Sequence, residues 1–572
     1  MIRLLSFFKG YIPQTIIAPV FKMLEACFEL LVPLIMASII DTGVRYKDTK
    51  YIVTMSLLLV GMGVLGLICS IIAQYFAARS SFRFGQILRS HLFDRVQQLT
   101  YTDLDQVGTS TLINRITTDL NQLQSGVNLT LRLFLRSPFI ILGSICISFF
   151  LDPSSAVIFI TVTVGLSILL WLFMQITIPI YNRCKSYLDS LTLLTSESIE
   201  GARVIRAFSR QTKQIQSFWE QNLFLKKSQY QAGSISALIN PLTYILVNLG
   251  VLVVLYQGSF AVNTGKLTQG QLVALINYMG QILLALLALS NLIVSITKAL
   301  SSANRIQQVL ELKPSFISGN QVAFSQKQVP YLKLEDVSFA YQQKPVLCNI
   351  SFCLYAGETL GIIGGTGSGK STLAQLIPGF YQPCSGIISF HGIPISEWNF
   401  SALRNKIALV EQKSVLLQGT IASNLFSRNS VATPEQIWQA LQVAQAADFV
   451  EKLPQGLETH VEAEGKNFSG GQKQRLCIAR ALVGDWQLLI LDDSSSALDY
   501  ATDSALQKQL KQHCSPEQSV IIISQRVASL QHCDKILVLD QGHAVGLGTH
   551  QQLLEHCEIY REICISQKEE TA

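Results

Sequence analysis

The chain has 572 residues, of which 49% are hydrophobic and only 14% are charged, and its mean hydropathy is +0.34. Soluble domains carry about 25% charged residues, so this composition excludes both an ordinary soluble enzyme and a disordered chain. The net charge of +6 is unevenly spread: residues 1–320 contain 25 Lys and Arg and 14 Asp and Glu, a net charge of +11, whereas the remainder has a net charge of −5.

The front half contains six stretches that are long and apolar enough to form membrane-spanning helices, since a bilayer core needs about 20 mostly apolar residues per helix. The first is apolar except for Lys22, Glu25 and Glu29, and the other five contain no charged residue. Six such stretches in series are not the pattern of a soluble core. They cover residues 16–40, 51–78, 137–151, 153–182, 228–265 and 267–297.

Basic residues concentrate in the connections that follow the second and the fourth stretch. Because basic connections stay on the cytoplasmic side, this pattern predicts a multi-pass protein of the cell (inner or plasma) membrane with both termini in the cytoplasm. The apolar spacing at 84–99 and 186–208 predicts that membrane helices continue into the cytosol. Short segments near 108–120 and 199–208 are predicted to dock onto a soluble partner, with solvated connectors as the alternative.

Glu25 and Glu29 are four residues apart and therefore share one helix face. Carboxylates at membrane depth are costly and usually face a cavity, so both residues are candidates for a substrate cavity that recognises cations. Two alternatives stay open: this part of the helix lies near the cytoplasmic interface, or the two carboxylates pair internally.

A linker at 313–329 separates the predicted membrane domain, 1–312, from a second domain at 330–572. There, a short apolar strand at 359–363 leads into a G-x-x-x-x-G-K-S loop and a helix. Such glycines let backbone N–H groups wrap phosphates, Lys370 reaches the β- and γ-phosphates, and the Ser371 hydroxyl binds Mg²⁺. The nucleotide-binding candidates in this loop and at the start of the helix are Gly364, Gly365, Thr366, Gly367, Ser368, Gly369, Lys370, Ser371 and Thr372.

A second acidic position follows the apolar run at 488–491. Asp492 ends this strand and is placed to hold Mg²⁺ through water, and Asp493 then lies next to the γ-phosphate. Between the two motifs, Ser469 is typical of a helix N-cap, with free backbone donors beside it that suit an anion.

The whole chain resembles an ABC transporter half of the exporter type. The resemblance implies an all-α polytopic membrane domain with six helices, followed by an α/β P-loop NTPase domain of ABC type that uses ATP and Mg²⁺. It also implies that Tyr341 stacks on adenine and that Gln412 joins Ser371 and Asp492 at Mg²⁺. The resemblance further implies a D-loop at residues 496–499, which ends at Asp499. The signature that closes over ATP held by another nucleotide-binding domain is Ser469, Gly470, Gly471 and Gln472.

Two candidate catalytic positions depart from the family pattern. Asp493 stands where the family has Glu, which orients the attacking water, and Gln525 stands where it has a switch His. Asp is one methylene shorter than Glu, and a misplacement of about 1 Å can cost on the order of 10²-fold in rate. Gln donates a hydrogen bond but cannot carry the imidazolium charge. The P-loop is therefore expected to bind ATP and to hydrolyse it slowly.

This combination resembles the degenerate-site half of heterodimeric bacterial multidrug exporters. The expected function is ATP-driven export of hydrophobic or amphipathic substrates (drugs, lipids or peptides) by alternating access. The expected partners are membrane lipid and a second exporter half with the intact Glu and His. Nucleic acid is not expected, because membrane topology explains the basic loops. A homodimer with two slow sites and an ATP-gated regulator or channel-like protein remain as alternatives.

Overall fold

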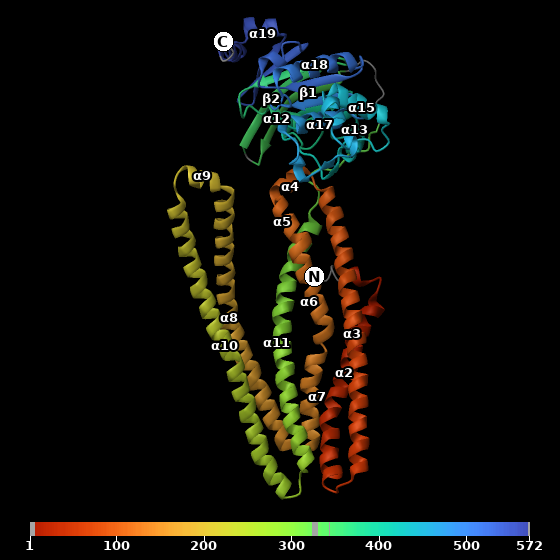
Figure 1. The fold of residues 1–572 in the computed structure, drawn as a ribbon, viewed down its shortest axis with the longest axis vertical. Coiled ribbons are helices and arrows are strands. Elements are labelled where there is room, and N and C mark those ends of the chain that lie inside the picture. Colours follow the sequence, from red (N-terminus) through yellow and green to blue (C-terminus); the bar gives the residue numbers. More distant parts are fainter. Residues whose placement is uncertain (1–5, 323–329, 343, 570–572) are drawn as a thin grey trace. The chain divides into compact units, whose positions relative to one another are not determined.

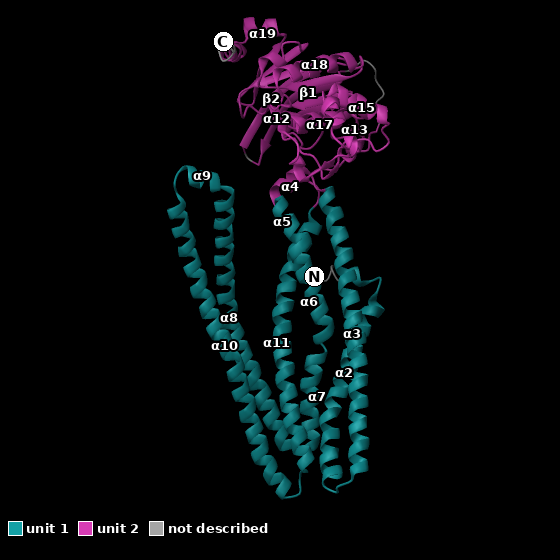
Figure 2. Cartoon of the chain, in the orientation of Figure 1, with its two compact units in different colours: residues 1–98, 108–312 teal, residues 99–107, 313–572 magenta. Residues whose placement is uncertain are grey.

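The computed structural model describes residues 6–322, 330–342 and 344–569 (Figure 1). The chain divides into two compact units, one formed by Met1–Gln98 and Gly108–Leu312 and the other by Leu99–Val107 and Lys313–Ala572 (Figure 2). Residues 323–329 of the expected linker at 313–329 lie outside the described residues. The same holds for residues 1–5 of the first expected domain and for residues 343 and 570–572 of the second.

Among the residues that the structure describes, six helices of the first unit are long and apolar enough to cross a membrane. A helix satisfies its backbone N–H and C=O groups internally, which the lipid interior requires of any segment that crosses it. Four of the six expected stretches fall within these helices, and the other two, 228–265 and 267–297, each pass a helix end by two residues, so the predicted helical membrane domain is confirmed. The helices run well beyond the apolar stretches and span Ile12–Val44, Thr49–Gln98, Thr109–Leu151, Pro153–Glu200, Gln211–Asn263 and Gln269–Glu311.

Polar residues set the ends of several of these helices. Asp152 caps the helix that begins at Pro153, because its carboxylate accepts the Ser155 N–H at 2.8 Å. Thr268 donates to Asp41 at 2.5 Å, which joins the end of the first span to the start of the last. The elements of this unit are η1 (Ser6–Phe8), α2 (Ile12–Ser38), η2 (Ile39–Val44), α3 (Thr49–Gln98), α5 (Thr109–Asn114), η3 (Arg115–Asp119), α6 (Leu120–Leu133), α7 (Arg136–Leu151), α8 (Pro153–Glu200), α9 (Ala202–Ala207), α10 (Gln211–Asn263) and α11 (Gln269–Glu311).

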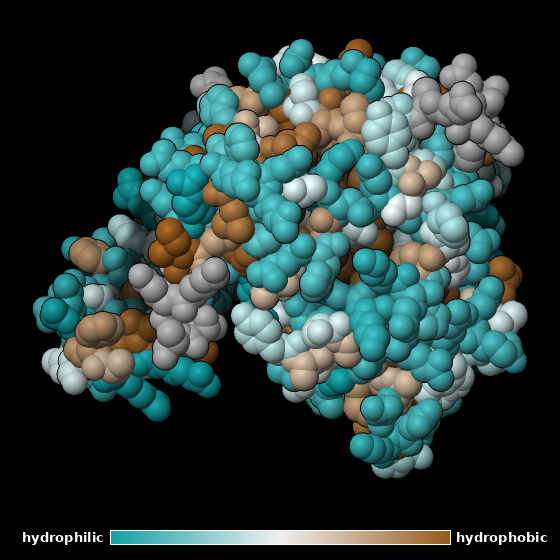
Figure 3. Space-filling view, turned by 90° about the horizontal axis from the view of Figure 1, so that it is seen from above, coloured by the Kyte–Doolittle hydropathy of each residue, from teal (hydrophilic) through white to brown (hydrophobic). Residues whose placement is uncertain are grey.

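The helices of the first unit bury one face and leave large apolar side chains on the other. Helices α8 and α10 run side by side, as do α2 and α3 (Figure 1). Phe159, Leu275 and Tyr278 belong to the buried core, whereas Leu57 and Trp171 are exposed. Apolar exposure on this scale suits contact with lipid. By contrast, the face of the second unit seen in Figure 3 is largely hydrophilic.

The second unit is an α/β domain built on a six-stranded sheet, so the predicted P-loop NTPase fold is confirmed. The strand order is β12-β11-β3-β10-β9-β6, and all neighbours are parallel except β11 and β12. A four-stranded sheet, β2-β1-β4-β5, and the pair β7-β8 complete it. The strands are β1 (Leu332–Tyr341), β2 (Lys344–Leu354), β3 (Thr359–Gly364), β4 (Ser385–Phe390), β5 (Ile393–Pro394), β6 (Ile407–Val410), β7 (Gly419–Thr420), β8 (His460–Val461), β9 (Leu488–Asp492), β10 (Ser519–Ile523), β11 (Lys535–Asp540) and β12 (His543–Gly548).

Helices cover the sheets through apolar residues such as Leu373, Leu476 and Leu506, all buried in the core. The inner strands β3, β10 and β9 are nearly continuous apolar runs, as expected of parallel strands that are covered on both faces. The helices of this unit are α4 (Tyr101–Val107), α12 (Lys370–Leu376), α13 (Phe400–Lys406), α14 (Ile421–Phe426), α15 (Pro434–Val443), α16 (Ala447–Glu451), η4 (Gly456–Glu458), η5 (Ala463–Gly465), α17 (Gly470–Leu482), α18 (Tyr500–His513), η6 (Val527–Ser529), α19 (His550–His556) and α20 (Glu558–Glu569).

Candidate functional site

Four parallel strands, β3, β10, β9 and β6, end at the same edge of the central sheet. The register pairs Ile523 of β10 with both Ile362 of β3 and Asp492 of β9. Ligands of open α/β sheets bind at the carboxyl ends of such strands. The sequence-predicted residues that end or follow these four strands are Gly364, Gln525, Asp493 and Gln412.

The loop after β3 adopts backbone conformations that favour glycine. Gly367 and Gly369 have φ values of +82° and +97°, in the left-handed region that strains residues with a Cβ. A Cβ on Gly364 would lie 2.1 Å from the Leu539 carbonyl oxygen. A Cβ on Gly365 or Gly367 would meet no atom within 4 Å, so the space beside the loop is open to a polyphosphate chain. Thr366 also faces solvent, whereas Ser368 and Thr372 are buried.

Lys370 opens α12 and folds back over this loop. Its Nζ donates to the carbonyl oxygens of Gly364 and Gly365 at 2.9 and 2.7 Å. Burial lowers the pKa of Lys370, and the charges of Asp493 and Asp492 oppose that shift. The hydrogen bonds of the ammonium group run to uncharged oxygens, so its charge is available to an anionic phosphate.

Ser371 and Asp492 form the oxygen pair expected at a magnesium site. The Ser371 hydroxyl donates to the Asp492 carboxylate at 3.0 Å, and Asp492 is buried. Burial raises the pKa of Asp492 and the neighbouring Asp493 acts in the same direction, whereas the Ser371 hydrogen bond opposes them. Mg²⁺ usually takes one or two protein oxygens and completes its shell with water and substrate phosphates, so this pair fits it.

The two altered positions lie at the ends of adjacent strands. The Asp493 N–H donates to the Ile523 carbonyl at 2.9 Å, one residue before Ser524 and two before Gln525. Asp493 has a φ of +47°, which turns the chain sharply after β9. Its side chain is half-buried and Gln525 is exposed. The structure thus brings both predicted catalytic residues to the edge that carries the P-loop.

Tyr341 lies beside the helix that the P-loop opens. Its hydroxyl donates to the Gln375 side chain of α12 at 3.4 Å, and its ring centroid is 5.4 Å from that of Tyr381. The Tyr341 side chain is 37% exposed, which leaves ring surface free for stacking. Gln412 is also exposed, two residues after the end of β6.

The Ser469–Gln472 segment caps α17 and lies against the D-loop. Ser469 and Gln472 form a capping box, in which each side chain accepts the other's backbone N–H at 3.3 and 2.9 Å. Gly470 is exposed, and a Cβ on Gly471 would lie 3.0 Å from the D-loop carbonyl of Ala497. Asp499 is the N-cap residue of α18, and its hydrogen bond with the Thr502 side chain lowers its pKa.

Helix α4 packs within the second unit, which corrects the expected position of the first docking segment. The sequence predicted docking near 108–120, but the segment grouped with the ATP-binding unit is Leu99–Val107. The Tyr101 ring stacks on Phe380 at 4.6 Å, and the Tyr381 hydroxyl donates to Asp105 at 2.6 Å. Burial and this hydrogen bond raise the pKa of Tyr381. The contact was missed because α4 has only seven residues, too few for a helical period to stand out, although the two nearby acids were a usable signal.

Asp103 joins α4 to the residues that enter the ATP-binding unit. Its buried carboxylate accepts from the Thr100 N–H at 2.9 Å and the Thr100 hydroxyl at 2.7 Å. It also accepts from the N–H of Ser315 at 3.2 Å and from the Ser315 hydroxyl. Burial raises the pKa of Asp103, but these hydrogen bonds outweigh burial and the net shift is downward.

In the membrane unit, Glu25 and Glu29 pair internally. Lys22 donates to Glu25 at 2.5 Å, and Arg136 of α7 donates to Glu29 at 2.7 Å. The four side chains have no net charge together. The side chain of Glu25 is 17% exposed and that of Glu29 is 38% exposed, so Glu29 is the more accessible of the two. Internal pairing was one of the alternatives left open by the sequence.

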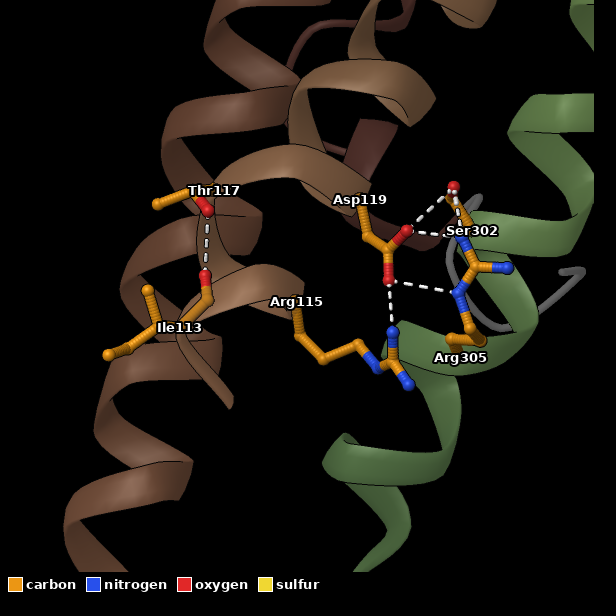
Figure 4. A network of polar contacts seen from close by, with 6 residues as sticks. All are labelled: Ile113, Arg115, Thr117, Asp119, Ser302 and Arg305. Atoms are coloured by element: carbon orange, nitrogen blue, oxygen red, sulfur yellow. Dashed lines mark hydrogen bonds and ion pairs between the residues drawn. The ribbon is translucent and has the colours of Figure 1, made fainter. Parts of the chain in front are cut away.

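A second ionic cluster joins η3 to α11 (Figure 4). Asp119 lies between Arg115, whose Nη1 is 2.6 Å away, and Arg305, which donates through Nε at 2.9 Å. The Ser302 hydroxyl donates to the same carboxylate at 3.0 Å. Arg115 and Asp119 bound a single π-helical turn, a feature frequent at functional sites. The cluster was missed because it joins residues 186 positions apart.

Comparisons with known proteins agree with this architecture. The family model for the ABC transporter transmembrane region matches residues 15–286, and that for the ABC transporter matches residues 347–496. The uncharacterized ABC transporter ATP-binding protein YfiB of Bacillus subtilis is 33% identical over 99% of this chain and 98% of that protein.

Two further comparisons concern proteins with a described activity. The ATP-dependent lipid A-core flippase of Escherichia coli K12 is 28% identical over 96% of this chain and 94% of that protein. The solved structure of a bacterial Atm1-family ABC exporter with ATP bound matches with a TM-score of 0.81 at 22% identity, over 97% of this chain and 98% of that chain. At this identity, the structural match shows a shared fold.

Proposed function

Because the chain belongs to the ABC transporter family, we propose that it is one half of an exporter whose own P-loop binds MgATP but hydrolyses it slowly. Its signature segment completes the active site of a second exporter half. One observation carries this proposal: the binding groups are in place, whereas Asp493 and Gln525 replace the two catalytic groups at the same sheet edge.

The proposed binding of MgATP is supported by the geometry of the P-loop. The open space beside Gly365 and Gly367 accommodates phosphates, and Lys370 supplies a positive charge there. Ser371 and Asp492 hold the magnesium ion, which neutralises charge on the phosphates when bound. The exposed Tyr341 ring offers an apolar face to a base.

The expected slow hydrolysis follows from the length of the Asp493 side chain and the charge of the Gln525 side chain. Asp493 is one methylene shorter than Glu, so its carboxylate falls short of the position from which Glu would orient water. Such a shift of about 1 Å costs on the order of 10²-fold in rate. Gln525 keeps a hydrogen-bond donor but no positive charge for the developing γ-phosphate charge. Both changes slow hydrolysis and leave ATP binding intact.

The signature segment is unaltered and faces outward. Ser469 and Gly470 are exposed, and their helix presents backbone N–H groups at its start. We place these donors, with Gln472 and the D-loop Asp499, at the ATP site of a second half that has the usual Glu and His. A homodimer with two slow sites is the alternative assembly.

For the transported substrate we propose hydrophobic or amphipathic molecules, including lipids. The similarity to the lipid A-core flippase supports lipid-like cargo, and the internal pairing of Glu25 argues against a free cation site there. Glu29 remains the candidate that faces substrate, because its side chain is the more exposed. We place the protein in the cell membrane with cytoplasmic termini, so that both ATP sites face cytosolic ATP.

The proposal is tested by restoring the two catalytic groups. The full chain is reconstituted in lipid nanodiscs, and ATP binding and ATP hydrolysis are measured for the wild type and for the double variant Asp493→Glu/Gln525→His. We expect wild-type binding with weak turnover, and an increase in turnover of about 10- to 100-fold in the double variant. Adding Lys370→Ala to the double variant is the control and abolishes the gain. Rapid wild-type turnover, or no gain in the double variant, would refute the slow-site proposal.

The transport role is tested in vesicles that contain the chain and a candidate second half. ATP-dependent movement of a fluorescent lipid or dye supports an exporter. An ATP-gated ionic current without such movement supports the channel-like alternative and contradicts the export proposal.

A further inference from the structure

The segment that carries Gln525 leaves the central sheet and continues without a strand neighbour. The Ser524 N–H donates to the Ile362 carbonyl at 3.2 Å, beside the last residue pair of β10 with β3. Past this point, the position of the 525 side chain depends on contacts made outside the sheet. Those contacts come from two sides of the loop.

The first side is the C-terminal helix α20, through the side-chain amide of Gln567. Its Nε2 donates to the Gln525 carbonyl oxygen at 2.6 Å, and its Oε1 accepts the Val527 N–H at 2.8 Å. An amide carries both a donor and an acceptor, so a single side chain bridges two backbone groups that are two residues apart. This bridge takes the place that a neighbouring strand would have.

Helix α20 is anchored well enough to hold the loop. Cys564, one turn before Gln567, is buried in the same apolar cluster as Tyr560 and Val527. Residues three apart lie on the same helix face, so the face that presents Gln567 is the buried one. The cluster also contains Ile363, the residue before the P-loop begins.

The second side is the D-loop. The guanidinium of Arg526 donates to the Leu498 carbonyl at 3.2 Å and lies 5.3 Å from the centre of the Tyr500 ring. The Ser529 hydroxyl donates to the buried Asp503 carboxylate at 2.7 Å. The segment at 525–527 is thus attached to the D-loop through Arg526 and to helix α20 through Gln567.

We propose that Gln567 is a positioning residue of the ATP site, which fixes the backbone at 525–527 and thereby the place where the residue-525 side chain meets the nucleotide. The kinetic consequence rests on the proposed slow site, but the attachment itself does not. Loss of both hydrogen bonds removes a restraint worth a factor of about 5 to 30 in the equilibrium between the held and released loop.

The first test measures amide hydrogen exchange in the full-length chain without nucleotide. Gln567→Leu removes both hydrogen bonds and keeps a similar volume, and we expect exchange in the peptide containing Val527 to rise about 5- to 30-fold. Ser566→Ala, on the neighbouring exposed residue of α20, is the matched control and leaves exchange unchanged. An unchanged rate in Gln567→Leu, or the same rise in both variants, overturns the proposal.

The second test measures kinetics in the Asp493→Glu/Gln525→His chain. There, Gln567→Leu is expected to lower kcat about 5- to 30-fold with little change in KM for ATP. Gln567→Glu, which keeps the acceptor for the Val527 N–H at the same reach and removes the donor to the Gln525 carbonyl, recovers part of the loss. Equal falls for the leucine and glutamate variants contradict positioning by this side chain. If the double variant shows no gain in turnover, the slow-site proposal fails while the exchange test still decides the attachment.

Discussion

Asp103→Asn is expected to destabilise helix α4, because the carboxylate accepts from Thr100 at the start of the helix and from Ser315 of a distant segment. The carboxylate accepts four hydrogen bonds, three of them at the same oxygen, and is only 6% exposed. An asparagine oriented to keep those three bonds makes them neutral, and hydrogen bonds to a charged group exceed neutral ones by about 1 kcal/mol each. The expected cost is therefore about 3 kcal/mol, or on the order of 10²-fold in the equilibrium for the local opening of α4.

The assay is amide hydrogen exchange across Tyr101–Val107 in the full chain, where protection should fall by that factor. Asp94→Asn, at an exposed position of α3, is the control. If exchange in Asp103→Asn rises no more than in this control, the four hydrogen bonds do not hold α4 and the reasoning is wrong.

The same carboxylate makes a pH prediction with a definite sign. Its pKa in the folded chain is lowered from the ordinary value of 3.8 by hydrogen bonds that outweigh burial. Its stabilising contribution is therefore complete above pH 3.8 and is lost as the pH falls towards the lowered pKa. Exchange of α4 in wild type and Asp103→Asn should differ at neutral pH and converge in strong acid.

Two further predictions concern the membrane unit. Asp119→Asn leaves two guanidinium groups without their carboxylate. Because the Arg305 side chain is 39% exposed, we discount the expected loss of stability to about 1–3 kcal/mol. The measurement is the midpoint of thermal unfolding in detergent, which should fall. An unchanged midpoint would contradict a stabilising cluster. Glu25→Gln should lower the midpoint more than Glu29→Gln, because Glu25 is the more buried and pairs at 2.5 Å; the reverse order would contradict this ranking.

Features that depend on local sequence could be predicted well. The membrane spans follow from uninterrupted apolar length, which is a property of each segment by itself. The P-loop follows from an apolar strand, a glycine-rich loop and a lysine in immediate succession, and Gly369 confirms the backbone requirement with its φ of +97°. The continuation of two helices beyond their apolar stretches was predicted as well: α3 ends at Gln98, against an expected end at 99, whereas α8 ends at Glu200, before the expected end at 208.

Contacts between distant segments were beyond the sequence. Asp103 meets Ser315 across 212 residues, and Asp119 meets Arg305 across 186. Each partner taken alone is an ordinary polar residue on a helix or in a linker. Only the fold shows that these carboxylates are buried and shared, and the same is true of Gln567 and the loop that it holds.

Asp493 and Gln525, the proposed catalytic positions, are separable from the framework that positions them. At both positions the observed framework contacts are made by the backbone: the Asp493 N–H bonds to Ile523, and the Gln525 carbonyl accepts from Gln567. The parallel pairing of β9 and β10 sets the register whatever the side chains at 493 and 525 are. Substitution at these positions therefore changes reach and charge without a change in fold. The proposed slow site therefore differs from a fast one in two side chains, and the reverse substitutions should restore turnover in a chain that folds normally.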